Sequence, residues 1–121
     1  MNSIKNHIIL FLLSFCYVSV QAQTQTNKVV TDTITVLGNC GMCKSRIEAA
    51  LDAKGIKAAE WDIQSKLLVV SYVPSKISLE QINQLIISVG HDTNSKKAED
   101  GVYSTLPGCC RFRENPNTHT D

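Results

Sequence analysis

The chain has 121 residues, with 12 Lys or Arg against 11 Asp or Glu and a formal net charge of +1. A nearly neutral chain without a basic run is a poor match for nucleic acid or for an anionic membrane surface as a partner. The length suits one domain with one modest hydrophobic core.

The first 22 residues have the pattern of a secretory signal peptide. Lys5 gives a positive start, residues 8–20 are mostly apolar, and Val20-Gln21-Ala22 places small residues where a signal peptidase cuts. An uncleaved anchor is the rival interpretation, but the apolar run is short for a membrane span. We therefore expect a periplasmic or secreted protein that begins near Gln23 and does not contact the membrane after cleavage.

Cleavage would leave four cysteines in two close-set pairs. Loss of residues 1–22 removes Lys5 and Cys16, so 11 basic residues, 11 acidic residues and four cysteines remain. Cysteines in an oxidising compartment commonly form disulfides. Two close-set pairs would close no long loop, however, so reactive or metal-binding sulfur is the better interpretation.

Hydrophobic periodicity predicts six elements in the order β-α-β-β-α-β after a polar, disordered leader at residues 23–30. Ala59, Trp61 and Ile63 are expected to face the core from the second strand. The last element is expected to be a short, polar edge strand. The expected ranges are 31–37, 44–54, 59–64, 67–73, 78–89 and 91–97.

Local signals define the ends of the two helices. Gly55 is expected to end the first helix in the left-handed conformation. Ser78 with Gln81 three residues later has the form of a capping box for the second helix, and Gly90 supplies its stop.

This order of elements predicts an α+β fold, a ferredoxin-like βαββαβ sandwich whose antiparallel sheet carries two helices on one face. The predicted domain spans residues 31–97. Residues 98–121 form a C-terminal extension, with a helical turn that includes Tyr103 and Leu106, a Cys-Cys pair and a polar tail.

Cys40-Gly41-Met42-Cys43 lies where the first strand pattern ends and the first helix pattern begins. A C-x-x-C spacing can turn two sulfurs toward one point, where they share a soft metal ion or exchange a disulfide. Cys43 would lie in the first helical turn, where free backbone N–H groups and the helix dipole favour a thiolate.

The chain here resembles the heavy-metal-associated domain family, which includes copper chaperones, modules of metal ATPases and periplasmic mercuric-ion binding proteins. The resemblance covers about residues 31–96. It rests on the strand–CxxC–helix start, on the segment from Tyr72 to Lys76, and on Gly90-His91-Asp92. The resemblance implies that the two motif cysteines bind a soft ion in an exposed loop and pass it on by thiolate exchange.

Three features depart from the family's usual pattern, and one of them is that the Cys109-Cys110 tail lies outside the common domain. Leu37-Gly38-Asn39 stands where the family has Gly-Met-x before the first cysteine, and Leu37 is expected to replace that methionine as a plug in the core. Many bacterial members have tyrosine at the position of His91.

Two thiolates suit ions that accept near-linear sulfur coordination, chiefly Cu(I) and then Hg(II). Zn(II) prefers four ligands and would need others. His91 is a candidate third ligand, since imidazole binds copper and zinc. The alternative is a solvent-facing loop histidine that never touches the ion.

Cys109 and Cys110 allow three interpretations. They could form a vicinal disulfide, pair with another chain, or fold back so that four sulfurs surround one ion or accept two. The 13 residues after Lys96 could extend about 40 Å, which is enough to cross a small domain. We favour a second thiol site that works with the first.

The sequence therefore predicts an exported, non-enzymatic protein that carries a soft metal ion, with Cu(I) favoured over Hg(II) and Zn(II). The predicted metal ligands are Cys40, Cys43, His91, Cys109 and Cys110. Its partner would be a metal transporter or an acceptor protein with its own cysteine site, and a metal-bridged homodimer is an alternative. Two rival functions stay open: a thiol-disulfide oxidoreductase that uses the CxxC, and a sensory or structural module of a transport system.

Overall fold

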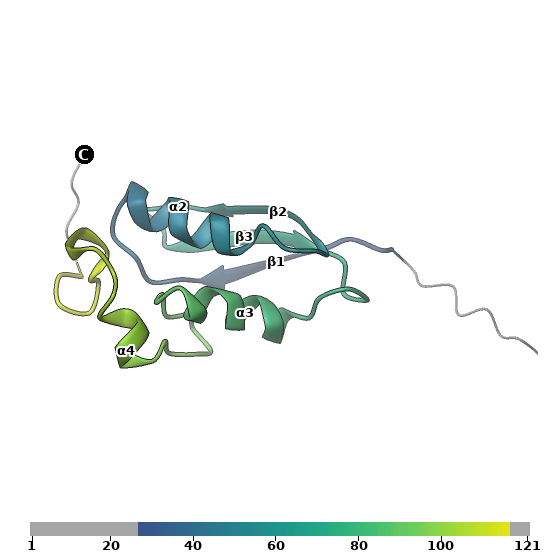
Figure 1. Cartoon of the computed structure of the whole chain (residues 1–121). Helices are drawn as coiled ribbons and strands as arrows, with labels where there is room; N and C mark the ends of the chain where they lie inside the picture. The colour runs from purple at the N-terminus through teal and green to yellow at the C-terminus, as the bar shows by residue number, and fades with distance from the viewer. Residues whose placement is uncertain (1–26, 117–121) are drawn as a thin grey trace, which may run out of the picture.

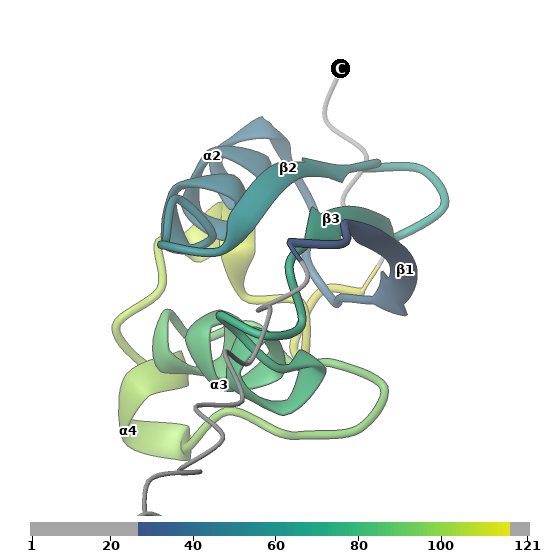
Figure 2. The same ribbon diagram turned by 90° about the vertical axis from the view of Figure 1, so that its right-hand side faces the viewer.

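The computed structural model describes residues 27–116 of the chain. Three antiparallel strands form a sheet in the order β1-β3-β2, and helices α2 and α3 lie side by side on one of its faces (Figure 1, Figure 2). The ferredoxin-like α+β prediction is confirmed. The elements are β1 (Val30–Thr35), α2 (Gly41–Ala50), β2 (Ile56–Trp61), β3 (Leu67–Tyr72), α3 (Leu79–Ser88), α4 (Asp100–Tyr103) and the 3-10 turn η1 (Gly108–Cys110).

The expected fourth strand at residues 91–97 is reduced to a single antiparallel bridge between Val36 and Thr93. Thr93 closes a tight turn instead: its backbone N–H donates to the carbonyl of Lys96 over 2.8 Å, and its Oγ1 accepts from the N–H of Lys96 over 3.0 Å. A threonine side chain that bonds to nearby backbone in this way competes with a strand ladder.

The core lies between the sheet and the two helices. Leu68, Val70 and Tyr72 of β3 are buried, whereas the residues between them point away from the helices, and Val69 is 47% exposed. This alternation matches a sheet with one covered face. Trp61 is fully buried as expected, while Ala59 and Ile63 are only partly buried against the core.

Helix α2 begins and ends earlier than its pattern predicts. It starts at Gly41 and stops at Ala50, where Leu51 is the C-cap residue. Gly55 has a φ of +96°, but it lies in the turn that enters β2 and is not the helix cap. A Cβ there would meet Lys76 and Ile77 at 2.9 and 3.0 Å, so the turn needs glycine for space as well as for conformation.

Helix α3 has the predicted ends. The backbone N–H of Gln81 donates to Ser78 Oγ over 3.1 Å, and the Gln81 side chain accepts from the N–H of Ser78 over 2.9 Å. Gly90 follows the helix with a φ of +96°, and its N–H donates to the carbonyl of Ile87. The capping box and the glycine stop are both confirmed.

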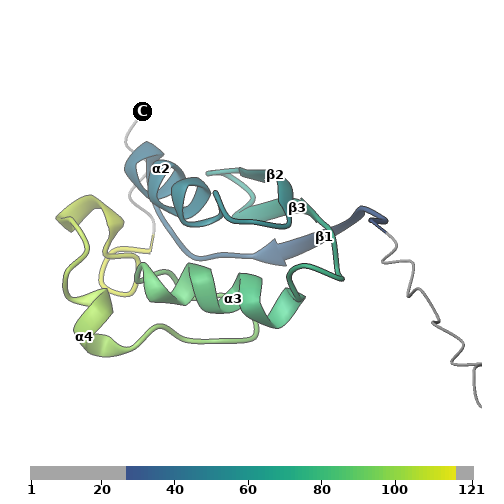
Figure 3. The same ribbon diagram turned by 45° about the vertical axis from the view of Figure 1, so that its right-hand side comes forward.

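The C-terminal extension returns to the end of the molecule where α2 begins (Figure 1, Figure 3). Tyr103 and Leu106 are both buried and join the main core, and a Cβ on Gly90 would meet Leu106 at 3.0 Å. The turn η1 contacts the start of α2. The extension is therefore packed onto the domain over residues 98–112.

Within residues 27–116, no helix is both long and apolar enough to cross a membrane. The predicted signal peptide at residues 1–22, and residues 23–26 of the predicted leader, lie outside the described residues. Strand β1 begins at Val30, the last residue of the range expected to be a disordered leader.

The capping box gives a direct test of this account of α3. Replacement Ser78→Ala should lower the free energy of unfolding by about 1 kcal/mol, because the backbone N–H of Gln81 loses its partner, the Ser78 hydroxyl. Urea unfolding of the reduced protein measures this change. Ser45→Ala is the control, since this exposed hydroxyl caps no helix end, and equal losses for both variants would contradict the assignment.

Candidate metal centre

The loop before the first cysteine rests on Trp61. The indole Nε1 donates to the carbonyl of Val36 over 3.0 Å, and this bond is buried. A Cβ on Gly38 would lie 3.0 Å from the indole ring and 3.0 Å from Cys43 Cβ. Gly38 therefore lets the loop pass between the tryptophan and the cysteine, a close approach that any larger residue would disturb.

Leu37 does not fill the position expected for it. Its side chain is 41% exposed, so it is not a core plug beneath the loop. The buried positions under the loop are taken by Val36 and Trp61, which are both fully buried. The bulky indole supplies the volume that the expected plug would have filled.

Helix α2 positions the two motif cysteines. Cys40 is the N-cap residue with an extended backbone, and Cys43 lies in the first turn with its side chain fully buried. The start of the helix is fixed to β2 through Lys44, whose Nζ donates to the carbonyl of Trp61 and pairs with Glu48, each over 2.7 Å. The bonds of the Lys44 ammonium group therefore link α2 to β2, and none of them is to a cysteine sulfur.

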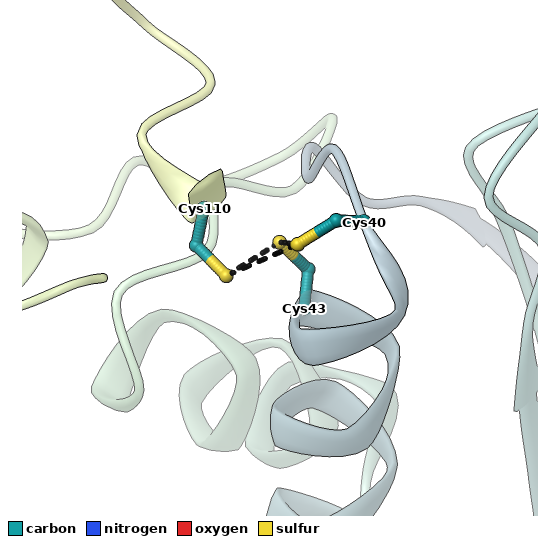
Figure 4. A group of neighbouring side chains, drawn as sticks. All are labelled: Cys40, Cys43 and Cys110. Atoms are coloured by element: carbon teal, nitrogen blue, oxygen red, sulfur yellow. Dashed lines mark hydrogen bonds between the residues drawn. The ribbon is translucent and has the colours of Figure 1, made fainter. Parts of the chain in front are cut away.

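Three cysteine sulfurs converge at this helix end (Figure 4). The Sγ atom of Cys40 lies 3.4 Å from that of Cys43 and 3.8 Å from that of Cys110, while the Cys43 and Cys110 sulfurs are 2.7 Å apart. Within the described residues these are the candidate ligand atoms that lie within 4.8 Å of one another. None of the three forms a disulfide.

Cys109 adds a fourth sulfur on the solvent side of the group. Its Sγ lies 3.2 Å from that of Cys40 and 4.0 Å from that of Cys110, and the residue is exposed. Its thiol is free, so the vicinal disulfide is not formed in this structure. The Cys109 sulfur also lies 3.5 Å from the Sδ atom of Met42, which is 54% exposed.

Bonds that involve no sulfur hold the tail in this position. The Arg113 guanidinium donates to both carboxylate oxygens of Asp92, over 2.7 and 3.1 Å, and its carbon lies 4.1 Å from the centre of the Tyr103 ring. Phe112 is buried and packs edge-on against Tyr103. This charge-assisted, two-point contact is the stronger kind of ion pair.

A second link joins the tail to the metal loop itself. The side-chain amide of Asn39 donates to the carbonyl of Asn115 over 2.8 Å, and the backbone N–H of Asn39 donates to Cys43 Sγ over 3.3 Å. One residue therefore connects the tail backbone with the buried cysteine.

His91 is completely buried, so the alternative of a solvent-facing histidine is wrong. Its Nδ1 donates to the carbonyl of Leu37 over 2.8 Å, its ring stacks on Phe112, and its Nε2 is buried without a hydrogen-bond partner. Burial lowers the pKa of His91, only partly opposed by the bond to Leu37, so the ring is neutral. The structure does not bring His91 into the sulfur group.

The cysteines differ in how readily they ionise. Burial acts to raise the pKa of Cys40, but hydrogen bonds with Cys109 and with the backbone of Cys43 outweigh it and lower the pKa to about 7. Hydrogen bonding to Cys40, and burial, raise the pKa of Cys109. Burial, with the neighbouring Cys43, raises the pKa of Cys110 strongly. Of Cys40, Cys109 and Cys110, only Cys40 has a lowered pKa, so among these three the thiolate forms most readily at Cys40.

Sequence reasoning missed the residues that dock the tail. The segment after Cys110 contains one aromatic residue, Phe112, between two arginines in an otherwise polar stretch. An isolated aromatic residue in a polar stretch indicates a segment that packs against the rest of the domain. The pairing of Arg113 with Asp92 has no comparable signal, because the two residues are far apart in the sequence.

The fold and the cysteine group together define a ferredoxin-like domain with a sulfur site at a strand–helix junction, and the domain is similar to known proteins. The family model for the heavy-metal-associated domain matches residues 39–92. The Copper chaperone CopZ of Staphylococcus aureus (strain bovine RF122 / ET3-1) is 34% identical over 55 residues, which span 45% of this chain and 81% of that protein.

Solved structures agree with this assignment. A structure of a CopZ metallochaperone is 30% identical with a TM-score of 0.51, over 53% of this chain and 98% of that chain. A solution structure from Bacillus anthracis str. Ames, described as copper-ion-binding, is 24% identical with a TM-score of 0.54, over 57% of this chain and 100% of that one; it supports the fold alone. The chain belongs to the heavy-metal-associated domain family.

Gly38 offers a test of how tightly the loop is packed. Gly38→Ala should lower the free energy of unfolding by about 1–3 kcal/mol, because the added methyl group must displace Trp61 or Cys43. Gly41→Ala is the matched control, since a Cβ there meets nothing within 4 Å. Urea unfolding of both reduced variants measures the change in the free energy of unfolding. A similar change in each would show that the space beside Gly38 can hold a methyl group without displacement of its neighbours.

The lowered pKa of Cys40 predicts a selective reaction. In the reduced protein, its alkylation by iodoacetamide should rise through a midpoint near pH 7, since only the thiolate attacks. Below that pH the thiol form predominates and the rate falls. Peptide mapping by mass spectrometry should show Cys109, which is also exposed, reacting only at higher pH. The opposite order would contradict the assignment of the thiolate to Cys40.

Proposed function

We propose that this protein is an exported carrier of a soft metal ion, with Cu(I) as its main cargo and Hg(II) and Zn(II) as weaker ones. The observation that supports this proposal most strongly is the 3.4 Å approach of the Cys40 and Cys43 sulfurs at the start of α2. Relatives of similar sequence are described as copper chaperones, and a pair of thiolates is a ligand set that Cu(I) accepts.

The site is arranged for exchange of the ion and not for permanent storage. Cys40 is partly exposed and has the lowered pKa, so it can release or accept an ion first. Cys43 is buried at the helix start, where the backbone N–H of Asn39 and the helix dipole stabilise its bound form. An acceptor with its own cysteine site would replace these ligands stepwise, through intermediates in which both proteins share the ion.

Features outside the site support the proposal of export and delivery. The pattern of residues 1–22 supports passage across a membrane before the domain folds. We propose no catalysis: ligand exchange needs only sulfurs that can reach a partner. The Met42 side chain beside Cys40 is 54% exposed and would lie at the edge of such a contact.

An anaerobic titration tests the proposed cargo. The fully reduced protein is titrated with Cu(I) in the presence of a competing chelator, and tight binding should be lost in Cys40→Ser and in Cys43→Ser. His91→Gln is the control and should change the affinity by less than about threefold, since this ring lies outside the sulfur group. Retention of Cu(I) by both serine variants would overturn the proposal.

The oxidoreductase alternative has one observation in its favour, the lowered pKa of Cys40. An insulin-reduction assay separates the two functions. A carrier should show no catalytic turnover above that of a simple dithiol, whereas sustained turnover that is lost in Cys40→Ser would favour the enzyme.

A further inference from the structure

We propose that the C-terminal tail turns the two-cysteine loop into a four-sulfur site for a single tetrahedral ion of the Zn(II) or Cd(II) class. This inference deepens the proposed function and rests on it, because it assigns four ligands to the Zn(II) class of ion at the same loop. Cys109 and Cys110 both lie beyond residues 39–92, which the family model covers. Their ligand role is therefore a property of this chain's extension.

The spacing of the sulfurs supports a four-coordinate ion. Zinc–sulfur bonds of about 2.3 Å in a tetrahedron place the sulfurs about 3.8 Å from one another. Five of the six sulfur–sulfur pairs among the four cysteines are 2.7, 3.2, 3.4, 3.8 and 4.0 Å apart. The sixth pair is Cys43 with Cys109, and Cys109 lies outside the group whose sulfurs are all within 4.8 Å of one another, so its side chain would move inward to complete the tetrahedron.

The tail is held in place before any ion arrives. Arg113 binds Asp92 through two hydrogen bonds, Phe112 is buried against Tyr103, and Asn115 accepts a bond from Asn39. These contacts do not involve the sulfurs, so the position of Cys109 and Cys110 is set by the fold. A ligand set that is already assembled loses little conformational freedom when it binds an ion.

The surroundings of the group suit bound thiolates. The N–H of Asn39 points at the sulfur of Cys43, and the group lies at the N-terminal end of the ten-residue helix α2. Hydrogen bonds to ligand sulfurs and a positive helix end both favour the deprotonated form that a metal ion requires. On binding, the ion would replace the protons of the remaining thiols, which pass to solvent.

The inference explains why one chain would carry two cysteine pairs. Cu(I) needs only the two thiolates of the loop cysteines as ligands, so the tail would add little to its affinity. A tetrahedral dication needs all four sulfurs, so its affinity would depend on the tail. The tail therefore determines the metal selectivity of the site: it raises the affinity for a tetrahedral dication and leaves the affinity for Cu(I) nearly unchanged.

Co(II) is the probe for this test, because tetrahedral thiolate coordination gives it intense visible bands that six-coordinate Co(II) lacks. The reduced protein should bind one Co(II) with a tetrahedral thiolate spectrum, and Zn(II) should displace it. Cys109→Ser and Cys110→Ser should each weaken Co(II) and Zn(II) binding by more than about 100-fold. The Cys109→Ser variant, whose sulfur lies outside the group of three, should keep Cu(I) affinity within about threefold of the original protein.

The two proposals fail in different ways. If Cu(I) is not bound by the original protein, the carrier function is wrong; if Cu(I) is bound but Cys109→Ser leaves Co(II) binding and its spectrum unchanged, the four-sulfur site is wrong. Two Co(II) ions per chain would also overturn it.

Arg113→Met supplies a second variant that keeps all four thiols. Loss of the bond to Asp92 should weaken Co(II) binding at least about tenfold and leave Cu(I) binding intact. Circular dichroism confirms that the domain is folded. A folded Arg113→Met variant with unchanged Co(II) affinity would contradict the role given to the tail.

Discussion

The packing of Trp61 beneath the loop is the constraint on which the site depends. The indole occupies the space under residues 36–38 and holds the Val36 carbonyl, while Gly38 passes over it with no room for a side chain. Cys43 is then fixed on the other side of the same glycine. Because interiors are close-packed, this arrangement leaves the sulfurs of α2 few alternative positions.

A second constraint is the attachment of the C-terminal extension to Asp92 of the domain. Asp92 lies just after α3, and its carboxylate receives both Arg113 and the backbone N–H of Ala98. One buried carboxylate therefore orients the start of the extension and its end. Cys109 and Cys110 lie between Ala98 and Arg113 in the sequence. Because both of these residues bind Asp92 of the domain, the segment that carries the cysteines is held against the start of α2.

The sequence carried most of the fold but only part of the site. Periodicity and the capping box located α3 because those signals are local, and the strand–CxxC–helix order predicted the position of Cys40 and Cys43. The fate of residues 91–97 was not predictable in the same way, since the side-chain turn at Thr93 competes with pairing at a sheet edge. The burial of His91 depends on Phe112, a contact between distant segments that no local pattern reveals.

The tethering of Cys109 and Cys110 has a kinetic consequence. Thiols on the same chain face the loop at an effective concentration that reaches the millimolar range even for flexible links, and here the link is packed. A free acceptor at ordinary cellular concentration would compete poorly with them. In the proposed four-sulfur site, transfer of the ion would therefore require an acceptor that docks first and displaces residues 108–113, so that recognition of the partner would precede loss of the ion.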